Sequence, residues 1–234
     1  MDIGTQIRVW AQAALARFGY QLKQIPRGDN PVLQPWHEDE EFVKLLWQVQ
    51  GRTLVDEVRC FMLYQFARLA AHIPGDVAEV GVYKGGTARL LCKTLGPAGK
   101  TLHLFDTFSG MPPTDRARDL HGEGDFSDTS LESVRKYLGD CGDVRLYEGI
   151  FPATAKPVED TAFSLVHVDV DVYKSAMDCC EFFYPRVQRG GFMVFDDYGF
   201  RSCPGLKTAV DEFFAGKPEE PLFLPSGQCL IIRS

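Results

Sequence analysis

The stretch DVAEVGVYKGGTARLLCKTL, residues 76–95, contains the pattern that decides the fold of this chain. Its first part, DVAEVGV, is apolar enough for a buried strand, and its last part, GGTARLLCKTL, has the spacing of a helix. Gly85 and Gly86 begin that helix and permit a tight turn before it. A strand that leads through such a turn directly into a helix is typical of a parallel sheet.

The same alternation continues along the rest of the chain. Further strands are predicted at residues 101–108, 143–149, 163–170 and 191–197, with helices at 130–138, 174–187 and 205–215. The final segment, PLFLPSGQCLIIRS (221–234), predicts a hairpin around its Ser-Gly pair. This order predicts an α/β fold with a mostly parallel sheet, helices on both faces and an antiparallel last strand.

Residues 1–75 show helical spacing without strand patterns. One amphipathic helix is predicted between Ile3 and Phe18, and two more at residues 38–50 and 54–73. We therefore divide the chain into an N-terminal helical extension, residues 1–75, and an α/β domain, residues 76–234, which we expect to form one structural unit.

The overall composition excludes several classes of partner. The chain has 234 residues, of which 45% are hydrophobic, so it can form one well-packed domain. Its 25 basic and 32 acidic residues give a net charge of −7, which argues against nucleic acid and anionic membranes as partners. No apolar run approaches the roughly 18 residues of a membrane span, and the N-terminus lacks a secretion signal. We expect a cytoplasmic protein.

The cysteines predict free thiols. The chain has seven of them, none in a C-x-x-C pair. Cys60, Cys92 and Cys179 lie in helix-like apolar patterns, which favours burial. We therefore expect reduced, buried thiols rather than disulfides or a zinc site.

Four carboxylates stand where two of the predicted strands end. Asp169 and Asp171 belong to HVDVDVYKSAMD (167–178), and side chains two apart in a strand share a face. Asp196 and Asp197 close the next strand along the chain. Carboxylates this close repel one another unless water, a cation or a basic partner relieves them. Since ligands bind at the carboxyl ends of parallel strands, we interpret the four as functional rather than as strand caps.

Two further features of the strand ends predict a nucleoside site. The glycine loop leads to a helix N-terminus with free N–H donors, but Val82 stands where a dinucleotide fingerprint requires its second glycine, which disfavours NAD. Glu79 interrupts an apolar strand and suits an ammonium group. Asp106, at the end of the next strand, suits the two hydroxyls of a ribose. NAD and S-adenosylmethionine share that ribose, so Asp106 does not choose between them.

Six segments together resemble the macrocin O-methyltransferase (TylF-like) family of class I S-adenosylmethionine-dependent enzymes, over roughly residues 50–234. In chain order they are EVGVYKGGTARLL, FDTFSGMPPTD, GDFSDTS, HVDVDVYKSAMD, GGFMVFDDYG and GLKTAVDEFF. The resemblance implies a Rossmann-like class I methyltransferase fold: a seven-stranded sheet, mostly parallel with an antiparallel last strand, plus N-terminal helices. It also implies that residues 76–234 bind S-adenosylmethionine and that residues 1–75 form a cap over the substrate.

The resemblance further implies which residues contact S-adenosylmethionine. They are Glu79, Gly81 and Thr87 at the methionine end, Asp106 at the ribose, Phe126, Ser127 and Gly149 near the adenine, and Tyr83, Gly85, Thr107 and Asp169 elsewhere along the cofactor.

The family pattern makes Asp169, Asp196 and Asp197 ligands of Mg²⁺, a cation that prefers oxygen donors. A cation held against two hydroxyl oxygens lowers the pKa of one of them. Asp171 remains as the candidate general base that takes the proton.

The sequence thus predicts a Mg²⁺-dependent O-methyltransferase for a small hydroxylated molecule, a sugar of a glycosylated natural product, and leaves open whether it forms a homo-oligomer. The alternatives are a catechol-type O-methyltransferase on an aromatic diol, a nucleoside-binding protein without catalysis, and an NAD-linked oxidoreductase, which Val82 and Tyr83 disfavour. His167 is expected to be a core residue with its polar atoms satisfied. The segment 112–128, which contains His121, is long enough to be either a lid or locally disordered.

Overall fold

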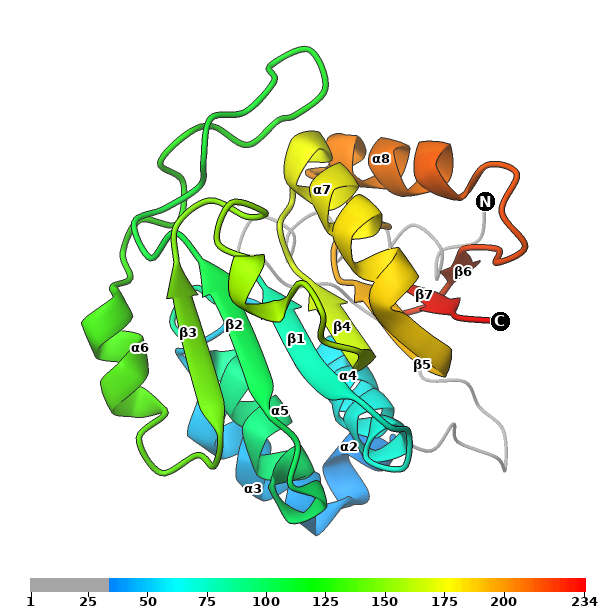
Figure 1. Ribbon diagram of the computed structural model, residues 1–234. Helices are drawn as coiled ribbons and strands as arrows, with labels where there is room; N and C mark the ends of the chain where they lie inside the picture. Colours follow the sequence, from blue (N-terminus) through cyan, green and yellow to red (C-terminus); the bar gives the residue numbers. More distant parts are fainter. Residues whose placement is uncertain (1–33) are drawn as a thin grey trace, which may run out of the picture. The chain divides into compact units, whose positions relative to one another are not determined.

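The computed structural model describes residues 34–234, and its sheet belongs to the compact unit Trp36–Ser234. The sheet has seven strands in the order β3-β2-β1-β4-β5-β7-β6 (Figure 1). The strands are β1 (Asp76–Val80), β2 (Leu102–Asp106), β3 (Val144–Glu148), β4 (Phe163–Val168), β5 (Val187–Phe195), β6 (Leu222–Phe223) and β7 (Cys229–Ile232). Strands β1 to β5 pair in parallel, and β7 runs antiparallel to β5, which confirms the predicted sheet.

In the described chain, three helices precede β1 and four lie between consecutive strands. They are α2 (Pro35–Glu38), α3 (Glu40–Val49), α4 (Glu57–Ala70), α5 (Gly86–Leu95), α6 (Leu131–Tyr137), α7 (Tyr173–Phe183) and α8 (Pro204–Phe214), with short 3₁₀ turns at Gly96–Ala98, Lys156–Val158 and Tyr184–Arg186. Helix α4 begins where the Asp56 side chain accepts hydrogen bonds from the N–H groups of Val58 and Arg59. The helix predicted between Ile3 and Phe18 lies outside the described residues.

The two faces of the sheet are covered by different helices (Figure 1). Alternate residues of β4 show this, because Leu165 joins a core with α3, α4 and α5, whereas Val166 joins a core with α7 and α8. All six residues of β4 are buried, as expected for a central parallel strand. Since α3 and α4 share a core with α5, these two predicted helices pack directly on the sheet domain. The domain division at residue 75 stays a prediction.

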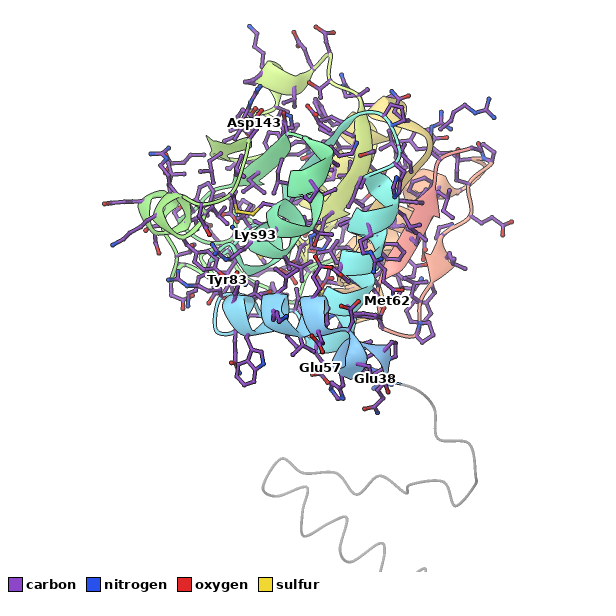
Figure 2. The ribbon with its side chains drawn as sticks, turned by 90° about the horizontal axis from the view of Figure 1, so that it is seen from below. Glu38, Glu57, Met62, Tyr83, Lys93 and Asp143 are labelled. Carbon is purple, nitrogen blue, oxygen red and sulfur yellow. A yellow bond between two sulfur atoms is a disulfide. The ribbon has the colours of Figure 1, made fainter. Side chains whose placement is uncertain are left out.

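The prediction of free thiols is wrong for one pair of cysteines. Cys92 of α5 and Cys141, just before β3, form a disulfide, with Cα atoms 5.8 Å apart (Figure 2, yellow bond). The pair is 49 residues apart in sequence and meets only because α5 and the turn before β3 lie side by side. The other cysteines of the described chain are free and buried, as predicted: Cys60, Cys179, Cys180, Cys203 and Cys229. Within residues 34–234, no helix combines the length and apolarity that crossing a bilayer requires.

Candidate active site

An open cavity lies at the carboxyl ends of the central strands. This edge is where strand order reverses between β1 and β4, the usual ligand position in such sheets. The cavity brings together most of the predicted site residues: Gly81, Tyr83, Thr87, Asp106, Thr107, Phe126, Gly149, Asp169, Asp171 and Asp197. Four predicted residues do not line it: Glu79, Gly85, Ser127 and Asp196. Of these, Glu79 and Asp196 are completely buried behind its wall.

Gly81 ends β1 where no other residue fits. Its φ of +87° lies in the left-handed region, and a Cβ atom there would stand 1.7 Å from the carbonyl oxygen of Asp169. The same close approach is held by a 2.9 Å hydrogen bond from the Asp169 N–H to the carbonyl of Val80. The glycine therefore brings the ends of β1 and β4 together and places Asp169 at the cavity.

Asp106 joins the loops that follow β1 and β2. Its Oδ2 accepts hydrogen bonds from the N–H groups of Val82 (2.6 Å) and Tyr83 (2.9 Å), and its Oδ1 accepts one from Phe108 (2.6 Å). A carboxylate has about four lone-pair positions, so these bonds leave limited room for the predicted ribose contact. Asp106 thus has a structural role that the sequence analysis did not predict.

The loop between β2 and α6 forms one side of the cavity. Phe126 meets the ring of Tyr83 edge-on with centroids 6.1 Å apart, and the Tyr83 hydroxyl donates to Asp128 at 2.8 Å. Segment 112–128 is docked by Asp119, a buried residue whose Oδ1 accepts the N–H of Tyr173 at 2.8 Å. This contact caps the start of α7. Pro112 and Phe126 of this segment line the cavity, and its action as a lid stays a prediction.

A buried chain of three polar side chains runs beneath the cavity. His167 Nδ1 is 2.8 Å from Glu79 Oε1, and its Nε2 is 3.5 Å from Asp196 Oδ1. Burial opposes a charge on the imidazole, but the hydrogen bonds to Asp196 and Glu79 prevail and raise the pKa of His167 to about 9. His167 is a satisfied core residue, as predicted, yet its two partners are predicted site residues. Glu79 Oε2 is buried and has no hydrogen-bond partner among residues 34–234.

Arg59 is a site residue that the sequence analysis missed. It lies on α4 and is only 8% exposed. Its Nη1 contacts Asp196 Oδ2 and lies 3.4 Å from Asp197 Oδ1, while its Nε donates to Asp56 at 2.9 Å. Burial alone would lower the pKa of Arg59, but the carboxylate of Asp196 outweighs it and keeps the guanidinium charged. The available signal was an arginine within the apolar pattern of 54–73, which requires a buried partner.

Asp169, Asp196 and Asp197 form a cluster whose oxygens lie within 4.8 Å of one another. Burial and the neighbouring carboxylates raise the pKa values of Asp169 and Asp197, whereas hydrogen bonding to His167 overcomes burial and lowers that of Asp196. Asp197 Oδ2 is buried without a hydrogen-bond partner in the described chain. The three carboxyl groups therefore crowd one another in spite of Arg59, and a bound cation would relieve that repulsion.

This arrangement fits a divalent cation with oxygen ligands. Asp169 and Asp197 offer the less engaged oxygens. Asp196 already has partners on both of its oxygens, Arg59 on one and Gln228 on the other at 2.8 Å. It would therefore share its carboxylate between the cation and Arg59.

Asp171 lines the cavity beside this cluster. Strand β4 ends at Val168, so strand alternation is not the reason that Asp169 and Asp171 both reach the cavity. Asp171 has a φ of +61°, a left-handed conformation that is uncommon for a non-glycine residue and turns the chain into α7. Its Oδ1 accepts a hydrogen bond from the Cys203 thiol at 3.2 Å, and burial raises its pKa. A carboxylate with a raised pKa at the cavity has the properties of a general base.

Known proteins resemble this chain in sequence and in fold. Residues 36–223 match the model of the macrocin-O-methyltransferase (TylF) family. The chain is 29% identical to demethyldecarbamoylnovobiocin O-methyltransferase of Streptomyces niveus over 185 residues, 72% of this chain and 70% of that protein. It is 31% identical to 8-demethyl-8-(2,3-dimethoxy-alpha-L-rhamnosyl)-tetracenomycin-C 4'-O-methyltransferase of Streptomyces olivaceus over 159 residues, 62% of this chain and 60% of that protein.

Solved structures show the same architecture. The O-methyltransferase NovP superposes with a TM-score of 0.69 at 27% identity and covers 78% of this chain and 82% of its own. The SAH-bound methyltransferase PaMTH1 of Podospora anserina superposes with a TM-score of 0.55 at 17% identity, over 100% of this chain and 97% of its own. These likenesses confirm the predicted class I methyltransferase fold.

Proposed function

This chain belongs to the macrocin-O-methyltransferase (TylF) family and is an S-adenosylmethionine-dependent O-methyltransferase, and we propose that it methylates a sugar hydroxyl of a glycosylated natural product with the help of Mg²⁺. The observation that carries the proposal is the cluster of Asp169, Asp196 and Asp197, which lies beside Asp171 at the ends of β4 and β5. The Streptomyces olivaceus relative, whose named substrate carries a rhamnosyl group, supports this acceptor class.

In this proposal Asp169 and Asp197 hold the cation, and Asp196 shares its carboxylate with it. When bound, the cation lowers the pKa of an acceptor hydroxyl. Arg59 and His167 keep Asp196 ionised and fixed in position. The three aspartates would thus hold a cation at one end of the cavity.

Asp171 takes the proton of the acceptor hydroxyl in this mechanism. Its Oδ1 is occupied by the Cys203 thiol, which leaves Oδ2 for the substrate. As the proton leaves, the acceptor oxygen forms a bond to the methyl carbon, the bond from that carbon to sulfur breaks, and its electron pair stays on the sulfur. A positioned base of this kind contributes about 10²–10⁴-fold to rate.

We propose that the β1 end of the cavity binds the cofactor. Bound S-adenosylmethionine supplies an electrophilic methyl group. Gly81 keeps its loop free of side chains, and the unpartnered Oε2 of Glu79 suits the ammonium group. Tyr83 and Phe126 offer aromatic surface next to the Asp106 loop. We propose that these residues hold the cofactor from its amino-acid end to its nucleoside.

The outer wall of the cavity suits a bulky acceptor. Leu54 and Ile150 line it and are 65% and 52% exposed. When a ligand covers exposed apolar side chains at a cavity mouth, apolar surface leaves water, which makes the free energy of binding more favourable. This supports an acceptor whose sugar enters the site while an apolar aglycone rests on the rim.

A substrate panel tests the proposal directly. Glycosylated natural products, their free sugars and simple aromatic diols would be incubated with S-adenosylmethionine, with Mg²⁺ or with a chelator, and methylated products identified by mass spectrometry. We expect methylation of a glycoside that stops in chelator and returns with Mg²⁺. Preferential methylation of the diols would favour the catechol-type alternative. Binding of S-adenosylmethionine without turnover on the whole panel would favour the non-catalytic alternative.

A further inference from the structure

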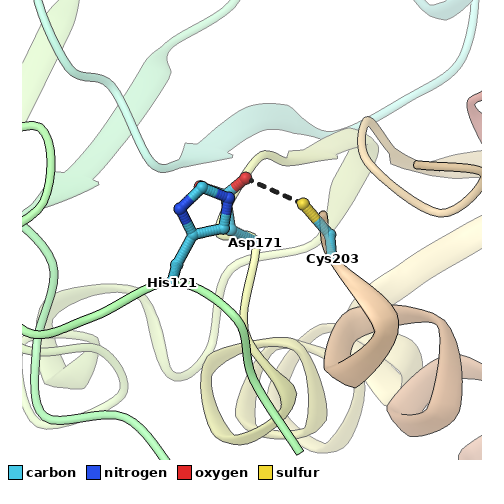
Figure 3. Close-up of side chains that lie close together, drawn as sticks. All are labelled: His121, Asp171 and Cys203. Carbon is cyan, nitrogen blue, oxygen red and sulfur yellow. Dashed lines mark hydrogen bonds between the residues drawn. The ribbon is translucent and has the colours of Figure 1, made fainter. Parts of the chain in front are cut away.

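A second group of metal-ligating side chains lies beside the cavity and offers different donor atoms. One ligand atom each from His121, Asp171 and Cys203 lies within 4.8 Å of the others. Figure 3 shows the imidazole of His121 turned towards Asp171, with Cys203 on the other side of that carboxylate. The three residues come from the β2–α6 loop, the end of β4 and the start of α8. The group therefore brings three kinds of donor close together: an imidazole nitrogen, a carboxylate oxygen and a sulfur.

The surrounding structure holds the three elements together. Asp119, two residues before His121, accepts the N–H of Tyr173 at 2.8 Å and so ties the loop to α7. A Cβ atom on Gly205 would lie 1.9 Å from Asp119 Oδ1, so the glycine lets the same loop dock on the start of α8. Cys203 is the residue immediately before α8. The contacts that place His121 thus place it against Cys203 as well.

His121 is oriented in the manner of a metal ligand. Its Nδ1 lies 3.3 Å from Asp125 Oδ2, and this contact leaves Nε2 as the nitrogen that can bind a cation. Histidine ligands commonly donate their other ring N–H to a carboxylate, which fixes the tautomer and the ring orientation. The loop therefore supplies the histidine together with the carboxylate that supports it.

Cys203 supplies the soft donor. It is 2% exposed, and its thiol donates a 3.2 Å hydrogen bond to Asp171 Oδ1. A cation would take the place of that proton, which is released to solvent as the thiolate binds the metal. Thiolate and imidazole donors select Zn²⁺ and similar transition metals, whereas the all-oxygen cluster of Asp169, Asp196 and Asp197 suits a hard cation.

We propose that His121, Asp171 and Cys203 bind a transition-metal dication of the Zn²⁺ class, with a fourth coordination position facing the cavity that Asp171 lines. Three protein ligands and one open position are the arrangement of accessible zinc sites in proteins. A consequence, which rests on the proposed function, is inhibition: a cation on Asp171 removes the base from the acceptor hydroxyl, so Zn²⁺ should slow methyl transfer.

Cobalt titration of the full chain tests the site without any assay of activity. Co²⁺ bound by a thiolate has a sulfur-to-metal charge-transfer absorption that oxygen ligands lack. We expect this band in the wild type, its loss in Cys203→Ser, and at least about tenfold weaker binding in His121→Ala. His72→Ala, which removes an exposed histidine at the end of α4, serves as the matched control and should bind as the wild type does.

Two outcomes would overturn the site. A wild-type spectrum without the thiolate band does so whatever the variants do, so the test does not depend on their folding. A band that survives in Cys203→Ser, with circular dichroism unchanged, assigns the cation to another cysteine. Because the readout is optical, the site can be tested even if no acceptor is ever methylated.

Inhibition is tested separately in Mg²⁺-saturated assays. Loss of turnover on adding Zn²⁺ in the wild type, with turnover retained in Cys203→Ser, supports the proposed consequence. Equal inhibition of both proteins would place the inhibitory cation on the aspartate cluster and overturn it.

Discussion

Replacing Arg59 with methionine should destabilise the protein strongly in the absence of metal and less strongly in its presence. Methionine keeps much of the volume and the apolar stem of arginine but removes its charge. The guanidinium contacts Asp196 and lies 3.4 Å from Asp197 Oδ1, in surroundings where Arg59 is 8% exposed and Asp196 is completely buried. Without the guanidinium, His167 is the basic neighbour that remains for Asp196.

The size of the effect follows from burial. Removing one partner of a buried ion pair costs about 3–5 kcal/mol, because the remaining charge stays in the interior without compensation. In a domain of this size, each kcal/mol corresponds to roughly 2–4 °C in Tm, so a decrease on the order of 10 °C is expected. A divalent cation on the aspartate cluster would supply the missing charge. Mg²⁺ should therefore raise the stability of Arg59→Met by about 1–2 kcal/mol more than that of the wild type.

Urea unfolding followed by circular dichroism, with and without Mg²⁺, measures both effects. Arg68→Met is the matched control, because Arg68 lies on the same helix with its side chain 61% exposed, 3.8 Å from Asp39 and 5.5 Å from the centre of the Tyr64 ring. It should change the free energy of unfolding by less than about 0.5 kcal/mol. If Arg59→Met were as stable as the control, or if Mg²⁺ stabilised all three proteins equally, the assignment of Arg59 as the internal counter-charge would be refuted.

Three further predictions concern other parts of the structure. Gly81→Ala should lower the free energy of unfolding by at least about 1–2 kcal/mol, because the new Cβ would displace Asp169. It should also lower the affinity for S-adenosylmethionine, and unchanged binding in calorimetry would contradict this. Asp171→Asn should reduce turnover by roughly 10²–10⁴-fold with much smaller changes in cofactor and Mg²⁺ affinity; rescue by excess Mg²⁺ would instead make Asp171 a metal ligand. Glu219 is buried, and although burial opposes its charge, bonds from Tyr184 and the C-terminal residues lower its pKa to about 2. Its folded-state pKa lies below the unfolded value of about 4.3, so its stabilisation is complete above that pH and is lost as the pH falls towards 2. Glu219→Gln should therefore be less stable than the wild type at pH 7 by about 1–3 kcal/mol and approach it at pH 3; a pH-independent difference in urea midpoints would argue against the shift.

Local patterns in the sequence were sufficient to predict the elements and their order. The strand predicted at 101–108 is observed at Leu102–Asp106, and the helix predicted at 205–215 at Pro204–Phe214. This works because the period of apolar residues reports which face of a segment is buried, and that information lies within the segment itself. The strand ends could also be predicted as the ligand site, since the carboxyl ends of parallel strands meet at one edge.

The partners of the buried polar groups could not be predicted in this way. Arg59 and Asp196 are 137 residues apart, and nothing in the helix pattern of 54–73 identifies which carboxylate the arginine meets. Cys92 and Cys141 form a disulfide that neither the odd cysteine count nor the spacing indicates. His121 and Cys203 approach Asp171 only because Asp119 docks the loop at the starts of α7 and α8.

The sequence by itself determined the order of strands and helices, the reversed last strand, the glycine that ends β1 and the edge at which carboxylates collect. Only the tertiary structure decided which of those carboxylates are paired, which lack a partner and which face a histidine and a thiol. The physical reason is that burial of an apolar face is a property of each segment, repeated along its length. The energy of a buried charge depends on the distance to its partner and on the exclusion of water, and both arise only when distant segments pack together.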